Sequence, residues 1–306
     1  MRPSQRIRHD RQNLAVLTAQ TLGWFILIEL LHSPIAWGWK VLVLLLFCQM
    51  MQGVFSMMHE CCHRNGHRNK RLNGIMGAWS STLFGSSYTL IRVNHEGHHQ
   101  RNRSTPELAE FILPGENAVF KVSLYYFAVL GGIWLGSFVA TLVLPFIPFQ
   151  YVKALAVRMV SMDGYNRSFS EFDANDWSVL RLEAGLAVLA WTACIYVFDW
   201  QWQVLLVAYA CYAFSYSSQQ WIYHMRTPLD RVEGAYDLRL PTPLRWLYLN
   251  FNYNLSHHRS PRTPWQELHA RVNRLETQPL WWRYVNVFRP PEPLHTDAAR
   301  LAKVYF

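Results

Sequence analysis

The 306-residue chain has few charged side chains: Asp, Glu, Lys and Arg make up 16% of it, against about 25% in an average soluble domain. Hydrophobic residues make up 51% and aromatic residues 15%. Disordered chains combine low hydrophobicity with high charge, so this composition excludes a disordered protein. It also argues against a surface that is covered on all sides by water.

Cysteine is scarce and irregularly placed. The five cysteines form an odd, scattered set without a C-x-x-C pair, so the sequence indicates neither a disulfide framework nor an iron–sulfur motif. The adjacent Cys61 and Cys62 are typical of reduced thiols in a cytosolic or membrane protein.

Long apolar stretches explain the shortage of charge. The mean hydropathy of −0.02 averages over five such stretches, at residues 14–31, 35–58, 119–149, 179–198 and 201–223, and a transmembrane helix needs about 20 apolar residues. The third stretch is long for one helix and short for two, which favours a bent, re-entrant hairpin turning near Gly131 and Gly132. A soluble protein with buried core helices is the alternative, but the remaining chain is too short to cover them. We therefore predict an all-α, multi-pass membrane bundle of about four transmembrane helices plus this hairpin, with a cytosolic helical cap.

Basic residues indicate how the bundle is oriented. The 29 Lys and Arg residues outnumber the 20 Asp and Glu residues, which gives a net charge of +9. The basic residues gather before the first apolar stretch, between residues 64 and 103, and after residue 225, whereas the turns at 32–34 and 199–201 have none. Cytoplasmic loops carry an excess of Lys and Arg, so we expect both termini and the middle loop in the cytosol. We divide the chain into a basic cytosolic N-terminus (1–12), a membrane domain (13–270) and a cytosolic C-terminal tail (271–306). Topology then accounts for the charge, and no nucleic-acid partner is expected.

The 13 histidines gather where the apolar stretches meet the cytosol. Residues three and four apart share a helix face, and this spacing recurs in H-E-C-C-H, in H-E-G-H-H, in N-L-S-H-H and between Gln220 and His224. Neutral imidazoles bind Zn, Cu, Fe and Ni, and eight are too many for one ion, so two ions are expected in the cap. The candidate metal ligands are His59, His63, His95, His98, His99, His224, His257, His258, Asn254 and Gln220. No catalytic residue is assigned apart from them. His67 continues the four-residue spacing after His63, but Gly66 indicates that the helix is ending there.

A zinc peptidase is a competing interpretation, because H-E-C-C-H and H-E-G-H-H both match H-E-x-x-H. In an intramembrane protease of this kind Glu60 would be the general base. Such an enzyme needs one motif, one further ligand and an open position for water, and the two motifs and the additional H-H pair exceed that requirement. Glu60 and Glu96 are interpreted either as groups that orient ligand imidazoles or as solvent-exposed residues at helix ends.

Three histidine boxes in this order, on one side of a helical membrane domain, resemble the membrane fatty acid desaturase and hydroxylase superfamily. The matching boxes lie at residues 59–63, 95–99 and 254–258, and the resemblance extends over roughly residues 35–270. Asn254 departs from the family pattern, which has His or Gln at that position, and an amide would bind iron more weakly than an imidazole. Gln220 and His224 are similar to an additional ligating His that has an amide residue four positions upstream.

The resemblance implies a non-haem di-iron centre that uses O2 to desaturate an acyl chain of a fatty acid or lipid. Hydroxylation, carotenoid oxygenation and alkene-forming decarboxylation occur in the same superfamily, and the spacing of the boxes does not separate them. The H-P-G-G motif of cytochrome b5 is absent, so a separate electron donor, a ferredoxin or a cytochrome b5-like protein, is implied. The expected partners are thus the lipid bilayer, an acyl lipid and this donor.

Overall fold

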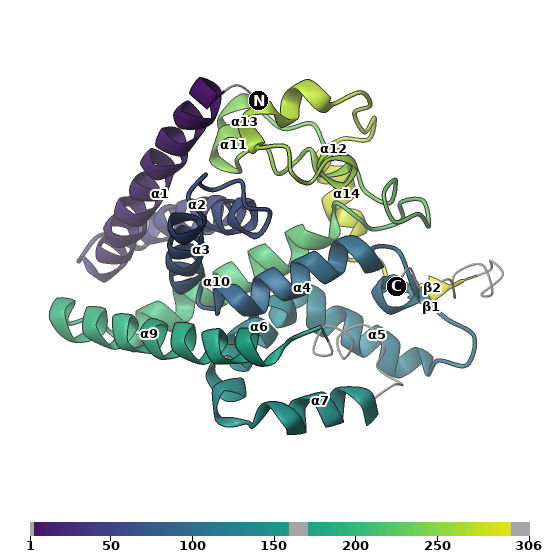
Figure 1. Ribbon diagram of the computed structural model, residues 1–306, viewed down its shortest axis with the longest axis horizontal. Helices are drawn as coiled ribbons and strands as arrows, with labels where there is room; N and C mark the ends of the chain where they lie inside the picture. The colour runs from purple at the N-terminus through teal and green to yellow at the C-terminus, as the bar shows by residue number, and fades with distance from the viewer. Residues whose placement is uncertain (1–2, 159–170, 295–306) are drawn as a thin grey trace.

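The computed structural model describes residues 3–158 and 171–294, and these residues are mostly helical (Figure 1). The first half contains α1 (Pro3–His32), α2 (Trp37–Cys62), α3 (Lys70–Phe84), α4 (Tyr88–Arg101), η1 (Thr105–Glu107), β1 (Phe111–Ile112), α5 (Ala118–Phe127), η2 (Ala128–Gly132), α6 (Ile133–Val143), η3 (Leu144–Phe146) and α7 (Phe149–Arg158). The second half contains α9 (Ala174–Phe198), α10 (Trp202–Trp221), α11 (Thr242–Leu247), α12 (Asn254–Arg259), α13 (Trp265–Leu268), η4 (His269–Arg271), α14 (Leu280–Asn286) and β2 (Glu292–Pro293). The all-α prediction is confirmed, apart from a two-residue parallel pairing of β1 with β2.

Four helical segments of the described chain are long and apolar enough to cross a membrane: Ser4–His32, Trp37–Cys62, Ala118–Phe146 and Ala174–Phe198. They coincide with four of the five predicted stretches, and α10 occupies the fifth. In α2, 67% of the most apolar window is buried inside the protein, against 17% in α9 and 22% in α1. Since α2 is enclosed by its neighbours, it is the centre of the bundle, and the other helices present apolar faces outward.

The first helix is longer than predicted. It begins at Pro3, so most of the basic segment 1–12 forms its first three turns. Asn13 explains how these turns are held, because its side chain donates to the carbonyl of Gly66 (2.9 Å) and accepts from the indole of Trp265 (2.8 Å). The N-terminal part of α1 is thereby fixed against α13, which lies near it in Figure 1.

The two short turns predicted to lie on one side of the membrane lie next to each other. The backbone N–H of Gln201 donates to His32 Nε2 (2.9 Å), and the indole of Trp200 donates to Glu29 (2.8 Å). Trp24 packs edge-on against Trp200, with ring centroids 5.4 Å apart. The α1–α2 and α9–α10 hairpins are therefore joined at their turns, at the end of the bundle remote from the histidine boxes.

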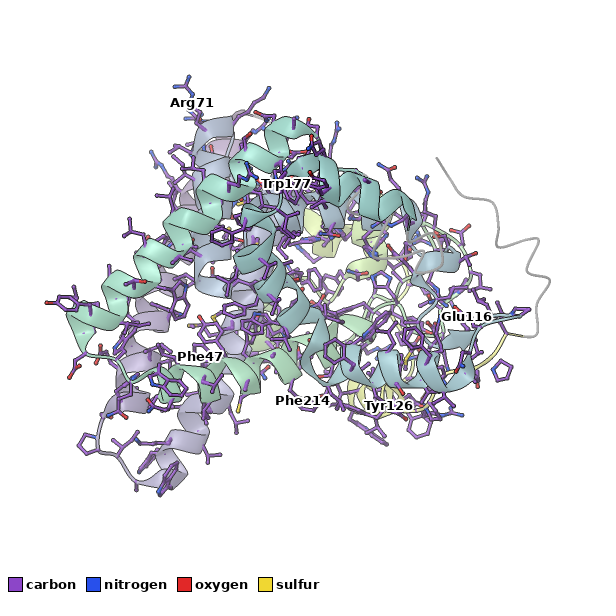
Figure 2. All side chains as sticks on the ribbon, turned by 90° about the horizontal axis from the view of Figure 1, so that it is seen from below. Phe47, Arg71, Glu116, Tyr126, Trp177 and Phe214 are labelled. Carbon is purple, nitrogen blue, oxygen red and sulfur yellow. The ribbon has the colours of Figure 1, made fainter. Side chains whose placement is uncertain are left out.

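The third apolar segment bends sharply at Gly131, which has a φ of 137° that few residues other than glycine adopt. Its end lies against the first turns of α9, where Trp177 Nε1 donates to the carbonyl of Ile147 (3.2 Å). That end of α9 is also held by α4, through an ion pair between Arg92 and Asp176 (2.5 Å). The predicted bend is confirmed, but α5 and α6 leave it in different directions (Figure 2), so the prediction that they lie side by side as a hairpin is wrong.

The histidine-bearing helix α4 is held at its start by a membrane-segment carboxylate. Ser87 caps α4 by accepting from Leu90 N, and Gly85, with a φ of 90°, makes the tight turn from α3. Glu183 of α9 accepts hydrogen bonds from Ser87 Oγ (2.6 Å) and from the backbone N–H of Thr89 (2.7 Å). A negative charge at this position also complements the positive end of the helix dipole.

The described part of the C-terminal tail packs onto the bundle. Tyr126 of α5 donates through its hydroxyl to the carbonyl of Phe288 (3.1 Å), and Tyr284 hydrogen-bonds Ser218 of α10 (2.9 Å). Val287 is fully buried in the same cluster. Residues 271–294 are therefore part of the helical body.

Candidate metal centre

Four separate segments bring the histidine boxes together. His59 lies in the last turn of α2 and His63 is its C-cap residue, while His95, His98 and His99 lie on the second half of α4. The other three lie beyond the bundle: His224 in the turns after α10, and His257 and His258 in α12. All eight predicted histidines therefore meet at one end of the molecule.

Five of them form one group, called here the five-histidine cluster: His59, His63, His95, His99 and His257. Three Nε2 pairs define its centre, His63–His95 at 2.7 Å, His63–His99 at 3.1 Å and His99–His257 at 3.0 Å. Metal–nitrogen bonds of about 2.1 Å meeting at right angles place neighbouring nitrogens about 3.0 Å apart. The rings are thus spaced as neighbouring ligands of a single ion, a geometry that hydrogen bonding among imidazoles alone does not require.

The other three histidines, His98, His224 and His258, form the three-histidine cluster. Two of its rings are held in orientation by hydrogen bonds at Nδ1. His98 Nδ1 lies 2.7 Å from Glu107 Oε2, and His224 Nδ1 lies 2.9 Å from the carbonyl oxygen of Gly234. A ring that donates through Nδ1 has its lone pair on Nε2, the nitrogen left to bind a metal.

The two H-H dipeptides explain how the clusters come to be adjacent. Successive helical residues point about 100° apart, so the members of an H-H pair cannot both face the same ion. His99 and His257 join the five-histidine cluster while their neighbours His98 and His258 join the other. The rings of His99 and His258 are 4.4 Å apart. Each dipeptide therefore contributes one imidazole to each of the two clusters.

Burial favours the neutral form of six of these rings, the form that metal binding requires. It lowers the pKa of His63 to about 4 and that of His99 to about 2. Burial likewise lowers the pKa of His95, His224, His257 and His258 well below the usual value, and neighbouring imidazoles add to the effect. A cation placed among these six rings would meet neutral imidazoles.

Three buried polar atoms at the site lack a protein partner: His59 Nε2, His258 Nε2 and Asn254 Oδ1. A buried polar atom without a partner costs about 1–3 kcal/mol, so such atoms are rare in folded proteins. A bound metal or a metal-bound water would satisfy them. Asn254, at the first position of the third box, thus has a free, buried oxygen of the type predicted to act as a ligand.

Two other predicted or ambiguous residues lie differently. Gln220 is half-buried in the last turn of α10, which ends at Trp221, so no regular helix face connects it to His224 as the spacing had suggested. Its role as a ligand stays a prediction. His67 belongs to neither cluster; its Nδ1 accepts from the backbone N–H of Asn69 (2.9 Å).

The carboxylates of the boxes take roles other than orienting ligand imidazoles. Glu60 is buried and accepts from the backbone N–H of Trp265 (3.1 Å), which joins α2 to the cap, and Glu96 pairs with Arg92 on the same helix (3.1 Å). The carboxylate that does contact a cluster histidine is Glu107, which follows α4 in the turn η1. Sequence analysis missed Glu107, although an acidic residue within ten positions of a histidine box was the available signal.

Comparisons with known proteins agree with this geometry. The family model described as fatty acid desaturase matches residues 35–285, which include both histidine clusters in full. A fatty acid desaturase of Bacillus subtilis (strain 168) is 22% identical over 231 residues, which cover 69% of this chain. The match spans 61% of the length of that relative.

Proposed function

Because the chain belongs to the fatty acid desaturase family, we propose that it is an O2-dependent di-iron oxidoreductase of the membrane that introduces a double bond into an acyl chain of a fatty acid or lipid. The observation that carries this proposal is the pair of adjoining histidine clusters, with five and three converging imidazoles. A peptidase with one zinc ion would need only one of the two clusters and would not account for the three-histidine cluster.

Eight imidazoles and one free amide oxygen fit two transition-metal ions. Nitrogen donors suit iron, zinc, copper and nickel alike, so the choice of iron rests on the family. We assign one ion to the five-histidine cluster and the other to the three-histidine cluster, with Asn254 as an additional ligand, directly or through water. Bound iron would supply the activation of O2 at this site, and Gln220 remains a proposed ligand of the second ion.

The protein around the clusters restricts the access of water. Phe251 packs edge-on against His59, with ring centroids 4.9 Å apart, and also contacts Phe55 (5.4 Å) and Tyr223 (5.1 Å). This aromatic wall lies on the bundle side of the metal centre. A dry, fixed surrounding protects an oxidising site from side reactions and holds the substrate carbon at one distance.

The proposed reaction needs electrons from another protein. Removing two hydrogens from –CH2–CH2– to form –CH=CH– while reducing O2 to two waters consumes two further electrons and two protons. We propose a separate ferredoxin or cytochrome b5-like donor. The Arg and Lys residues after α2 support, through the positive-inside rule, our proposal that the metal centre and both termini lie in the cytosol. An acidic donor would be attracted to these residues there.

The proposal is tested by measuring metal and product together. The chain is expressed in cells that lack acyl desaturation, the purified protein is analysed for metals, and the cell lipids are analysed by mass spectrometry. We expect two irons per chain and an acyl product lighter by two hydrogens. His257→Ala should abolish the product and lower the iron content, whereas His67→Ala, a histidine outside both clusters, should change neither.

Other outcomes would overturn the proposal in different ways. A product heavier by one oxygen would make the protein a hydroxylase of the same superfamily. One zinc per chain with unchanged lipids would support the peptidase, in which Glu60→Gln abolishes peptide cleavage. Asn254 is tested separately: Asn254→His should keep the iron, and wild-type iron content in Asn254→Leu would show that this residue is not a ligand.

A further inference from the structure

The short helix α14 has an apolar side that nothing in the described chain covers. Trp281, Trp282 and Val285 share one face of it, and their exposed fractions are 65%, 44% and 56%. The opposite face is buried in a cluster with α5 and α10, through residues that include Tyr284 and Val287. Exposed apolar clusters are unfavourable in water. Two exposed tryptophans on a helix whose opposite face is packed therefore indicate that the exposed face has a partner.

The position of α14 relative to the bundle indicates what that partner is. Phe288, just after α14, stacks on Phe214 of α10 with ring centroids 6.1 Å apart. Phe214 precedes the end of α10 by seven residues, about 10 Å along the helix axis, and its side chain is 40% exposed on the outside of the bundle. Tyr126 and Phe214 lie along the same edge of the molecule in Figure 2, and each contacts Phe288. The segment after α14 therefore lies alongside the last two turns of α10, on the outward apolar surface of the bundle.

The residues just after α14 are bound to the first helix of a predicted membrane segment. Tyr125 and Tyr126 of α5 donate to the carbonyls of Val287 and Phe288. The same helix starts the apolar segment Ala118–Phe146, where Val119 and Phe120 have exposed fractions of 77% and 57%. Tryptophan is enriched at the level of lipid headgroups, where its ring is partly apolar and its N–H partly hydrated.

We propose that α14 lies in the plane of the membrane surface and inserts Trp281, Trp282 and Val285 into the lipid. The exposed Arg289, which follows it, would meet anionic headgroups. The proposal changes the expectation for segment 271–306: its described part is a membrane-surface element and not a tail in the cytosol. It depends on the membrane segments and is independent of the proposed reaction.

Lipid contact at α14 would also fix the depth of the third histidine box. Arg283 of α14 lies 4.0 Å above the ring of Tyr236, and the backbone N–H of Glu276 donates to the carbonyl of Asp237 (2.8 Å). The carboxylate of Asp237 in turn accepts from the backbone N–H (2.9 Å) and hydroxyl (2.6 Å) of Ser256 in α12. A rigid chain of contacts thus connects the membrane surface to the helix that carries His257 and His258.

Site-specific quenching by lipids tests the proposal. In a background with Cys194 and Cys211 changed to Ala and the buried Cys48, Cys61 and Cys62 retained, Trp282→Cys is labelled with an environment-sensitive fluorophore. The full chain is placed in nanodiscs of phosphatidylcholine and phosphatidylglycerol that carry a spin label at the headgroup, at carbon 5 or at carbon 12. Arg274→Cys is the matched control in the same segment, and Leu182→Cys, 61% exposed on α9, reports a lipid-facing membrane segment.

We expect the label at position 282 to be quenched most by the carbon-5 label, at least about twofold more than the label at position 274. Equal quenching at 282 and 274 would overturn the proposal. Strong crosslinking between two unlabelled Trp282→Cys chains by a thiol-reactive crosslinker, with no quenching of the labelled protein by lipid, would also overturn it and would identify the face as a contact between copies. If Trp282→Cys does not fold, Val285→Cys on the same face gives the same test.

Discussion

The imidazole of His98 and the carboxylate of Glu107 are joined by a 2.7 Å hydrogen bond at Nδ1, on the side of the ring away from the three-histidine cluster. Glu107 also accepts from the guanidinium of Arg101 (3.2 Å), so the carboxylate itself is held in place. A carboxylate behind a ligand histidine fixes the ring and raises its basicity, and removing one lowers metal affinity by about 10–100-fold.

Glu107→Ala should therefore weaken metal binding at the three-histidine cluster alone. We expect iron content to fall from two to about one per chain after dialysis against a weak chelator, while the unfolding temperature of the metal-free protein changes little. Glu107→Gln, which keeps an acceptor oxygen, should retain more metal than Glu107→Ala. Glu116→Gln is the control, because Glu116 pairs with Lys121 and with the backbone N–H of Leu113, and neither residue belongs to a histidine cluster. Equal metal loss in Glu107→Ala and Glu116→Gln would contradict this role for Glu107.

A second prediction concerns Glu183, which holds the start of α4. Its carboxylate accepts from Ser87 Oγ, Thr89 N and Thr89 Oγ1, and an amide at this position would direct N–H groups at donors. We expect Glu183→Gln to lower the free energy of unfolding by about 1–3 kcal/mol, measured by thermal unfolding in detergent. Asp199→Asn, at the other end of α9, is the matched acid-to-amide control, since Asn tolerates the left-handed conformation of that residue (φ 52°). Equal melting temperatures for the two variants would show that Glu183 does not stabilise the start of α4.

The sequence predicts the helices and the grouping of the histidines well because both depend on local pattern. Hydropathy locates the apolar helices within a few residues of their observed ends, except for α1, whose basic first turns carry no apolar signal. The assignment of His98 and His99 to different clusters follows from helix geometry and could have been predicted from the spacing alone.

Other features depend on contacts between distant residues, which pattern does not reveal. Glu183 and Thr89 are 94 positions apart, and nothing in either segment indicates the pairing. The position of α14 on the bundle depends on single contacts such as that between Phe288 and Phe214. Charge and hydropathy alone predict a cytosolic C-terminal tail here, because two tryptophans are too few to form an apolar stretch.

A third prediction uses two glycines of α2. A Cβ atom at Gly53 would lie 2.4 Å from the backbone carbonyl of Leu247, whereas one at Gly38 would meet nothing within 4 Å. Because a backbone atom of α11 cannot move independently, Gly53→Ala should destabilise the protein by about 1–3 kcal/mol. Gly38→Ala should be neutral or stabilising by up to about 1 kcal/mol, since alanine favours the helix. Thermal unfolding of both variants decides the matter, and a Gly53→Ala protein as stable as Gly38→Ala would show that α2 and α11 do not pack this closely.

The last prediction is that the metal-free protein becomes less stable as the pH falls below about 6.5. Burial holds the pKa of His63 at about 4 and that of His99 at about 2 in the folded protein, whereas an unfolded histidine has a pKa of about 6.5. Below pH 6.5 the unfolded chain takes up protons that the folded chain does not, so each such histidine costs up to about 1.4 kcal/mol of stability per pH unit, until the pH reaches its folded pKa. Well above pH 6.5 both states are neutral at these rings and their contribution is constant. Unfolding temperatures measured in a strong chelator at pH 7.5, 6.5 and 5.5 should fall mainly across the lower interval, and less steeply in His63→Gln/His99→Gln. An equal decline in that variant would show that the acid sensitivity arises elsewhere in the chain.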